Sequence, residues 1–169
     1  MSFMAAYPEF RDAYNKLPAK LANGPHGLGH WIRVAENGFW LADELGVNKR
    51  VIILFAAYHD AWRTHDGSDL MHGHLAADAM MNMDLDLEPN DRDRLLTAVR
   101  MHPLGQTTSD PLIGACWDAD RLDLSRVGVV PHPDYMSTEP AIDSLMRQYE
   151  AETDTVSLRA ARAAANNFN

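Results

Sequence analysis

The sequence contains one cysteine, Cys116, and no long apolar run. A single cysteine excludes an internal disulfide and a cysteine-based zinc ribbon, and it suits a reducing compartment. The longest apolar segment, Val51 to Tyr58, is far shorter than the roughly 18 residues that span a bilayer. The N-terminal MSFMAAYPEFRD has no basic stretch followed by an apolar one. We therefore expect a cytoplasmic protein with no membrane partner.

Positive charge is also scarce. The chain has 15 lysines and arginines against 24 acidic residues, which gives a net charge of −9. This balance argues against binding to the phosphate backbone of nucleic acids. It does not argue against a small phosphorylated substrate, because a local pocket can be positive on an acidic protein. Eight histidines accompany the acidic residues, and imidazoles together with carboxylates are common metal ligands.

The spacing of apolar residues is helical throughout. With 169 residues, 46% of them hydrophobic, the chain is long enough for one domain with its own core. There is no repeat, low-complexity block or convincing period-2 strand. We expect a single all-α domain over residues 1–169, a bundle of about six to eight helices. The expected helices cover about 8–17, 25–45, 48–63, 69–83, 90–102, 110–124, 137–151 and, in the alanine-rich tail, 154–165.

Histidines and aspartates recur inside these apolar helices. Asp60 follows the apolar run VIILFAAY, and a buried carboxylate costs several kcal/mol unless it has a cationic partner. A divalent metal ion would be such a partner. Adjacent helical residues point about 100° apart, so the pair His59-Asp60 can reach one ion between helices. The candidate ligands in GHWIRV, YHDAW and WDADRLDL are His30, His59, Asp60 and Asp120.

The order of these residues resembles the HD superfamily of metal-dependent phosphohydrolases, over roughly Gly24 to Val130. LFAAYHDAWR is similar to the second ligand helix of that family, and DADRLDL to the segment whose Asp precedes Arg. DGSDLMHGHLAA and GACWDADRLDLSRVGVVP look like a small, uncharacterised bacterial subgroup. The resemblance implies an HD-type helical fold and a metal site that uses the four ligands named above. It also implies that Asp118 is an orienting group outside the ligand set.

The number of metal ions is open at this point. Some HD relatives bind a second ion through two further histidines, and the resemblance offers His102 together with His72 or His74. The segment HGHLAA favours His72. The alternative is that His72 and His102 only form hydrogen bonds to substrate or water. We expect one divalent transition metal ion, which can be Mn, Fe, Zn, Ni or Co, with two ions as the alternative.

The expected reaction is hydrolysis of a small phosphate ester, with a nucleotide mildly favoured. A site with three or four protein ligands leaves positions for water and substrate. Asp60 would orient the attacking water, and Arg63 and Arg33 would bind phosphate oxygens. Arg121 is expected to neutralise carboxylates.

Three tryptophans near the site have two possible interpretations. Trp31, Trp62 and Trp117 adjoin ligand positions and can stack a base, although their spacing is also typical of a core. The histidines expected at the surface or pocket rim, without a role, are His26, His65 and His132. Two other functions remain: an HD-type mixed-valent di-iron oxygenase, and a catalytically silent metal-binding module.

Overall fold

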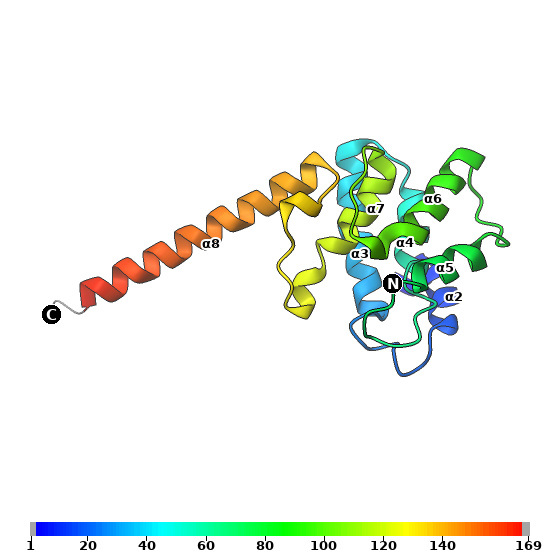
Figure 1. The fold of residues 1–169 in the computed structure, drawn as a ribbon, viewed down its shortest axis with the longest axis horizontal. Helices are drawn as coiled ribbons and strands as arrows, with labels where there is room; N and C mark the ends of the chain where they lie inside the picture. Colours follow the sequence, from blue (N-terminus) through cyan, green and yellow to red (C-terminus); the bar gives the residue numbers. More distant parts are fainter. Residues whose placement is uncertain (1–2, 167–169) are drawn as a thin grey trace.

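The computed structural model describes residues 3–166, and the regular elements in this part of the chain are all helices, without a strand (Figure 1). The prediction of an all-α fold is confirmed. The α-helices are α1 (Phe3–Ala6), α2 (Pro8–Lys16), α3 (Leu28–Leu45), α4 (Lys49–Tyr58), α5 (His72–Met80), α6 (Pro89–Met101), α7 (Pro111–Arg121) and α8 (Glu139–Asn166). Three 3₁₀ turns are η1 (His102–Leu104), η2 (Leu124–Val127) and η3 (Pro133–Tyr135).

Helices α3, α4 and α7 form the centre of the molecule. Helix α3 packs against both α4 and α7, and every residue of α4 from Val51 to Tyr58 is buried. Helix α2 packs against α4. Helix α5 packs against α6, and α6 in turn packs against α4 and α7. Helix α8 begins near α3 and η3 and extends away from the other helices (Figure 1). Among residues 3–166 no helix combines the length and apolar character needed to cross a membrane.

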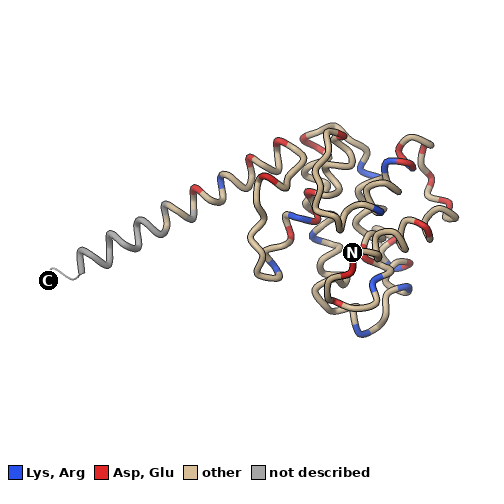
Figure 2. The backbone as a smooth tube through the Cα atoms, in the orientation of Figure 1, with Lys and Arg blue, Asp and Glu red and all other residues tan. Residues whose placement is uncertain are grey.

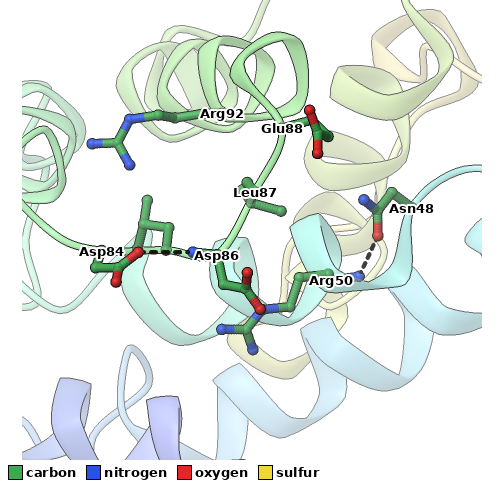
Figure 3. Close-up of a pocket in the computed structure, with 8 residues that line it drawn as sticks. Asn48, Arg50, Asp84, Asp86, Leu87, Glu88 and Arg92 are labelled. Carbon is green, nitrogen blue, oxygen red and sulfur yellow. Dashed lines mark hydrogen bonds between the residues drawn. The ribbon is translucent and has the colours of Figure 1, made fainter.

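Two of the expected helix starts are confirmed in detail. Asn48 caps α4, because its side-chain oxygen accepts a hydrogen bond from the Arg50 backbone N–H (Figure 3). Asp110 caps α7 by accepting from the backbone N–H groups of Leu112 and Ile113, with Pro111 in the first turn. Such a cap contributes about 1 kcal/mol.

Other expected boundaries are wrong. Helix α3 begins at Leu28, because Gly27 is extended and the chain before it turns. Helix α4 ends at Tyr58, so the His59-Asp60 pair lies at its C-terminal end and not inside it. Helix α5 begins only at His72. Helix α6 begins at Pro89, so Asn90 is not its cap. The two helices expected after residue 137 are one, α8.

Helices α5 and α6 touch at Gly73. A Cβ atom at this position would lie 2.7 Å from the carbonyl oxygen of Val99 and 2.9 Å from that of Arg100. The absent side chain therefore lets the start of α5 sit directly on the end of α6. This contact matters for the site, because Gly73 follows His72 and η1 begins with His102.

The loop between α5 and α6 is acidic (Figure 2). It borders a hollow of about 400 Å³ that also contains Arg50 and Arg92 (Figure 3). Both cations are already used. Arg92 donates to the carbonyl oxygens of Met80, Met81 and Met83, and Arg50 pairs with Glu9. Arg92 therefore fastens the end of α5 and the start of this loop to α6, whereas Arg50 joins α4 to α2.

Candidate metal centre

Four imidazoles and two carboxylates converge between the central helices and the α5–α6 pair. They come from the first turn of α3, the end of α4, the first residue of α5, the first residue of η1 and the end of α7. In three trios of these groups, the donor atoms all lie within 4.8 Å of one another. The six residues are His30, His59, Asp60, His72, His102 and Asp120.

Asp60 lies at the middle of the cluster and is almost fully buried. Its Oδ2 is 3.6 Å from Nε2 of both His30 and His59. Its Oδ1 is 3.0 Å from Nε2 of His72 and 3.7 Å from Nε2 of His102. One carboxylate thus faces two separate histidine pairs, one with each oxygen.

The first pair is completed by Asp120 on α7. Its Oδ1 lies 3.2 Å from Nε2 of His30 and 3.9 Å from Nε2 of His59. The side chain of Asp120 is 21% exposed, whereas both histidines are buried. The structure therefore brings together all four residues that the sequence predicts for one metal site, with Asp120 on its open side.

The second pair answers the question of which histidine of HGH faces the cluster. Nε2 of His72 lies 2.8 Å from Nε2 of His102. The Nδ1 atom of His74 is buried without a hydrogen-bond partner, and His74 belongs to none of the trios. His102 does not point to solvent. The geometry therefore supplies a second donor set through His72, as the HG resemblance implies.

The hydrogen bonds of the imidazoles test whether this donor set fits a metal ion. Each Nδ1 faces an acceptor, which assigns the hydrogen to Nδ1 and leaves a lone pair on Nε2 of the neutral ring. Two Nε2 atoms then face each other, 3.2 Å apart for His30 and His59, and a cation between them removes the lone-pair repulsion. The acceptors are Asp123 Oδ2 for His30, Phe55 O and Ala56 O for His59, Asp69 O for His72 and Val99 O for His102. The chemistry of the donors therefore fits a divalent cation in each set.

Electrostatics agree with this fit. Burial lowers the pKa of His59 to about 3, so its ring is neutral. Burial also opposes the charge on Asp60 and Asp120, but their histidine neighbours hold the pKa of each carboxyl well below its usual range. For His30, burial is outweighed by hydrogen bonds to Asp120 and Asp123, which raise its pKa above 6.5. A raised pKa favours a proton on His30, and this proton would occupy the position that a bound cation would take.

Two contacts of the cluster were missed by the sequence reasoning. Asp123 holds Nδ1 of His30 at 2.7 Å and also accepts from Arg33 Nε at 2.6 Å. His26 reaches Asp60, with Nδ1 3.0 Å from Oδ2. Asp123 lies three residues after Asp120, and this helical spacing was the signal that could have indicated its contact with the cluster. His26 precedes α3, so its position four residues before His30 was no guide to the contact.

A hollow of about 290 Å³ opens over the cluster. Arg63 lines this hollow and is nearly buried. Its Nε donates a hydrogen bond to Asp60 Oδ1 at 2.9 Å, and its Nη1 donates to the Gly67 carbonyl oxygen at 3.0 Å. Arg33 is not among the lining residues and pairs with Asp123. Arg121 also lines the hollow.

Of the two readings of the tryptophans, base stacking or core packing, the structure supports core packing. Trp31 is fully buried, and Trp117 is buried with its indole N–H bonded to Ala98 O at 2.9 Å. Trp62 lies against Lys16 and Tyr58. None of the three lines the hollow, so their helical spacing reflects core packing.

Asp118 has a structural contact in place of the expected orienting one. Its carboxylate is fully buried and accepts hydrogen bonds from the backbone N–H groups of Ser137 and Thr138 and from the Thr138 hydroxyl. Asp118 thus fastens the segment before α8 to α7. Arg121 is likewise held by carbonyl oxygens, those of Tyr135 and Gln106, and lies 4.0 Å from Asp118.

No family model matches the sequence, and no curated protein matches it. One solved structure is similar over nearly its whole length: the crystal structure of a predicted HD superfamily hydrolase from an uncultured Thermotogales bacterium. The match covers 95% of this chain and 92% of that chain, with a TM-score of 0.68 and 22% sequence identity. At this identity the comparison shows the fold alone: this chain has the same helical fold as that structure.

Proposed function

From this fold and the two histidine sets on Asp60, we propose that the chain is an HD-superfamily phosphohydrolase that uses divalent metal ions to hydrolyse a small phosphate ester. The proposal treats residues 1–169 as one such domain. The observation that carries it is the division of the Asp60 carboxylate between His30/His59 and His72/His102. A structural ion needs only one closed set of ligands. A carboxylate that faces two histidine pairs below an open hollow is instead typical of two catalytic metal ions.

The geometry favours two ions over the single ion expected from the sequence. His30, His59, Asp60 and Asp120 would hold the first, and Asp60, His72 and His102 the second. Bound divalent ions supply Lewis acids that acidify water and polarise a phosphoryl oxygen. The imidazole and carboxylate ligands suit a borderline transition ion such as Mn, Fe, Zn, Ni or Co.

The protein residues have separate tasks in this reaction. Asp60 is ionised and accepts a hydrogen bond from the attacking water, which orients that water toward phosphorus. Arg63 lines the hollow beside Asp60 and is proposed to contact phosphate oxygens. Arg33, which is 46% exposed, supports the site through Asp123 and His30. The water oxygen forms a bond to phosphorus, the ester P–O bond breaks, and the alcohol leaves with a proton.

The experiment that tests the proposal begins with elemental analysis of protein purified without added metal. We expect two ions per wild-type chain, and one ion per chain in His72→Ala and His102→Ala. His74→Ala is the matched control and should keep two. Protein loaded with Mn²⁺, Fe²⁺, Ni²⁺ or Zn²⁺ is then tested on phosphomonoesters and phosphodiesters. If no loaded form hydrolyses any of them, the phosphohydrolase assignment fails.

The di-iron oxygenase alternative keeps one observation in its favour. It requires both additional histidines as ligands, and His72 and His102 lie 2.8 Å apart at Nε2 beside Asp60. Iron as the dominant metal, together with substrate-dependent consumption of O₂ and no phosphate release, would favour the oxygenase. A metal content of two ions with neither activity would favour a silent binding module.

A further inference from the structure

A second hollow adjoins the one over the metal cluster. It measures about 220 Å³ and lies between η1, η2 and η3. Gly105, Arg121 and Leu124 line both hollows. Because they share a wall, a small molecule whose one end lies at the cluster can extend its other end into the second hollow.

The second hollow is apolar where the first is charged. Its lining includes Val129, Val130, Pro131 and Met136. Val129 and Val130 are 49% and 68% exposed, although both are apolar. Exposed apolar side chains gathered around a concave surface beside a polar site are typical of ligand binding.

Two polar side chains in this wall, Arg121 and His132, already have hydrogen-bond partners. The two terminal nitrogens of Arg121 donate to Tyr135 O and Gln106 O, at 2.5 Å and 2.6 Å. Nδ1 of His132 accepts from the Asp134 backbone N–H at 3.3 Å. A sugar or a nucleobase needs several hydrogen-bond partners when it leaves water. The hollow is therefore better suited to a hydrocarbon group.

We propose that the second hollow binds the apolar part of the substrate, so that the substrate class is phosphate monoesters of hydrophobic alcohols. The proposal rests on the proposed function for the phosphate end, which lies over the metal cluster. Water adds to phosphorus, the P–O bond to the alcohol oxygen breaks, and the alcohol leaves from the apolar hollow with a proton.

The test uses metal-loaded protein and the series from methyl phosphate to n-hexyl phosphate. We expect kcat/KM to rise about three- to fourfold for each added methylene until the hollow is filled, the factor that methylene burial provides. Val130→Asp should flatten this dependence, because a carboxylate at the lip opposes a hydrocarbon. Val127→Asp is the matched control: Val127 is 45% exposed, close in the chain, and lines neither hollow, so its chain-length dependence should equal that of wild type.

Calorimetry with n-alkylphosphonates separates this inference from the proposed function, because their P–C bond is not hydrolysed. Hydrolysis at equal kcat/KM for methyl and hexyl phosphate would overturn the inference and leave the phosphohydrolase standing. No hydrolysis, but phosphonate binding that tightens with chain length and loses this dependence in Val130→Asp, would support the apolar site and remove the phosphohydrolase. No hydrolysis and no dependence of binding on chain length would overturn both.

Discussion

At the scale of single residues, each imidazole in the cluster is oriented by the hydrogen bond at its Nδ1. For three of the rings the acceptors are backbone carbonyl oxygens, and for the fourth, His30, the acceptor is the Asp123 carboxylate. A backbone carbonyl oxygen is present at every residue, whatever its side chain, so a substitution does not remove it. A carboxylate depends on one side chain, which makes Asp123 the orienting contact that a substitution can remove.

Asp123→Asn should weaken metal binding about tenfold to a hundredfold, the range seen for lost outer contacts of ligand histidines. The amide is a weaker acceptor for the His30 N–H and no longer neutralises Arg33 and Arg126. Competition with a chromophoric chelator measures the affinity. Asp134→Asn, on an exposed side chain, is the control. Unchanged affinity in Asp123→Asn would show that the contact does not orient His30.

Asp60→Asn should lower turnover at least about a hundredfold, the usual range for general-base groups. The amide keeps the size and one carbonyl ligand but loses the negative charge that faces both histidine pairs. The melting temperature and turnover are measured on the same preparations. A purely structural metal predicts the opposite pattern: a large fall in melting temperature, with no wild-type phosphoesterase activity to lose.

At the scale of elements, the second histidine pair depends on how closely α5 approaches α6. His72 and His102 start their elements at this contact, and Gly73 is the residue that allows it. The two nearest neighbours of the missing Cβ are backbone oxygens of α6, which cannot rotate away as a side chain can. The position of His72 is therefore controlled by a residue that has no chemistry of its own.

Gly73→Ala should destabilise the protein by about 1–3 kcal/mol through overpacking, and it should reduce the metal content from two ions to one by displacing His72. Urea unfolding and elemental analysis measure the two effects. Gly29→Ala is the matched control, since Gly29 also adjoins a cluster histidine in a helix, but its Cβ would meet only Arg33 Nη1, at 3.5 Å. Two ions in Gly73→Ala would contradict the expected displacement.

At the scale of the whole molecule, the cluster joins segments that are far apart in the chain. The cluster contains residues of α3, α5, η1 and α7 and the two residues that follow α4, and Asp60 contacts three of the other segments directly. Metal ions bound to such a set stabilise the folded state, because the unfolded chain does not hold these groups together.

Removing the metal with a chelator should lower the melting temperature of the protein.

Metal binding should also be weaker at low pH. The direction of this pH dependence follows from His30, whose pKa is raised above 6.5 in the metal-free protein. Below that raised pKa the ring is protonated and the metal ion must displace the proton, so affinity falls by about tenfold per pH unit for each proton displaced. Calorimetric titration in buffers of different ionisation enthalpy measures the protons released. Release of no proton below pH 6.5 would contradict the assignment.

The amino-acid sequence by itself determined the helical class, the caps of α4 and α7, and the set of residues that could bind metal. These properties follow from local chemistry: the spacing of apolar residues, the side chains of Asn48 and Asp110, and the cost of burying Asp60 without a cation. The roles of the ligands remain predictions. The resemblance of His30, His59-Asp60 and Asp120 to HD proteins indicated the fold that the structural comparison shows.

Only the tertiary structure decided which side chains face one another. His72 and His74 are two residues apart, about 200° around a helix, and the rotation of α5 against α6 determines which one meets Asp60. The same holds for Asp123, whose partner His30 is 93 residues away, and for Trp117, whose indole is buried against α6. Spacing along the chain specifies the face of one helix, whereas contacts between helices depend on how all of them pack.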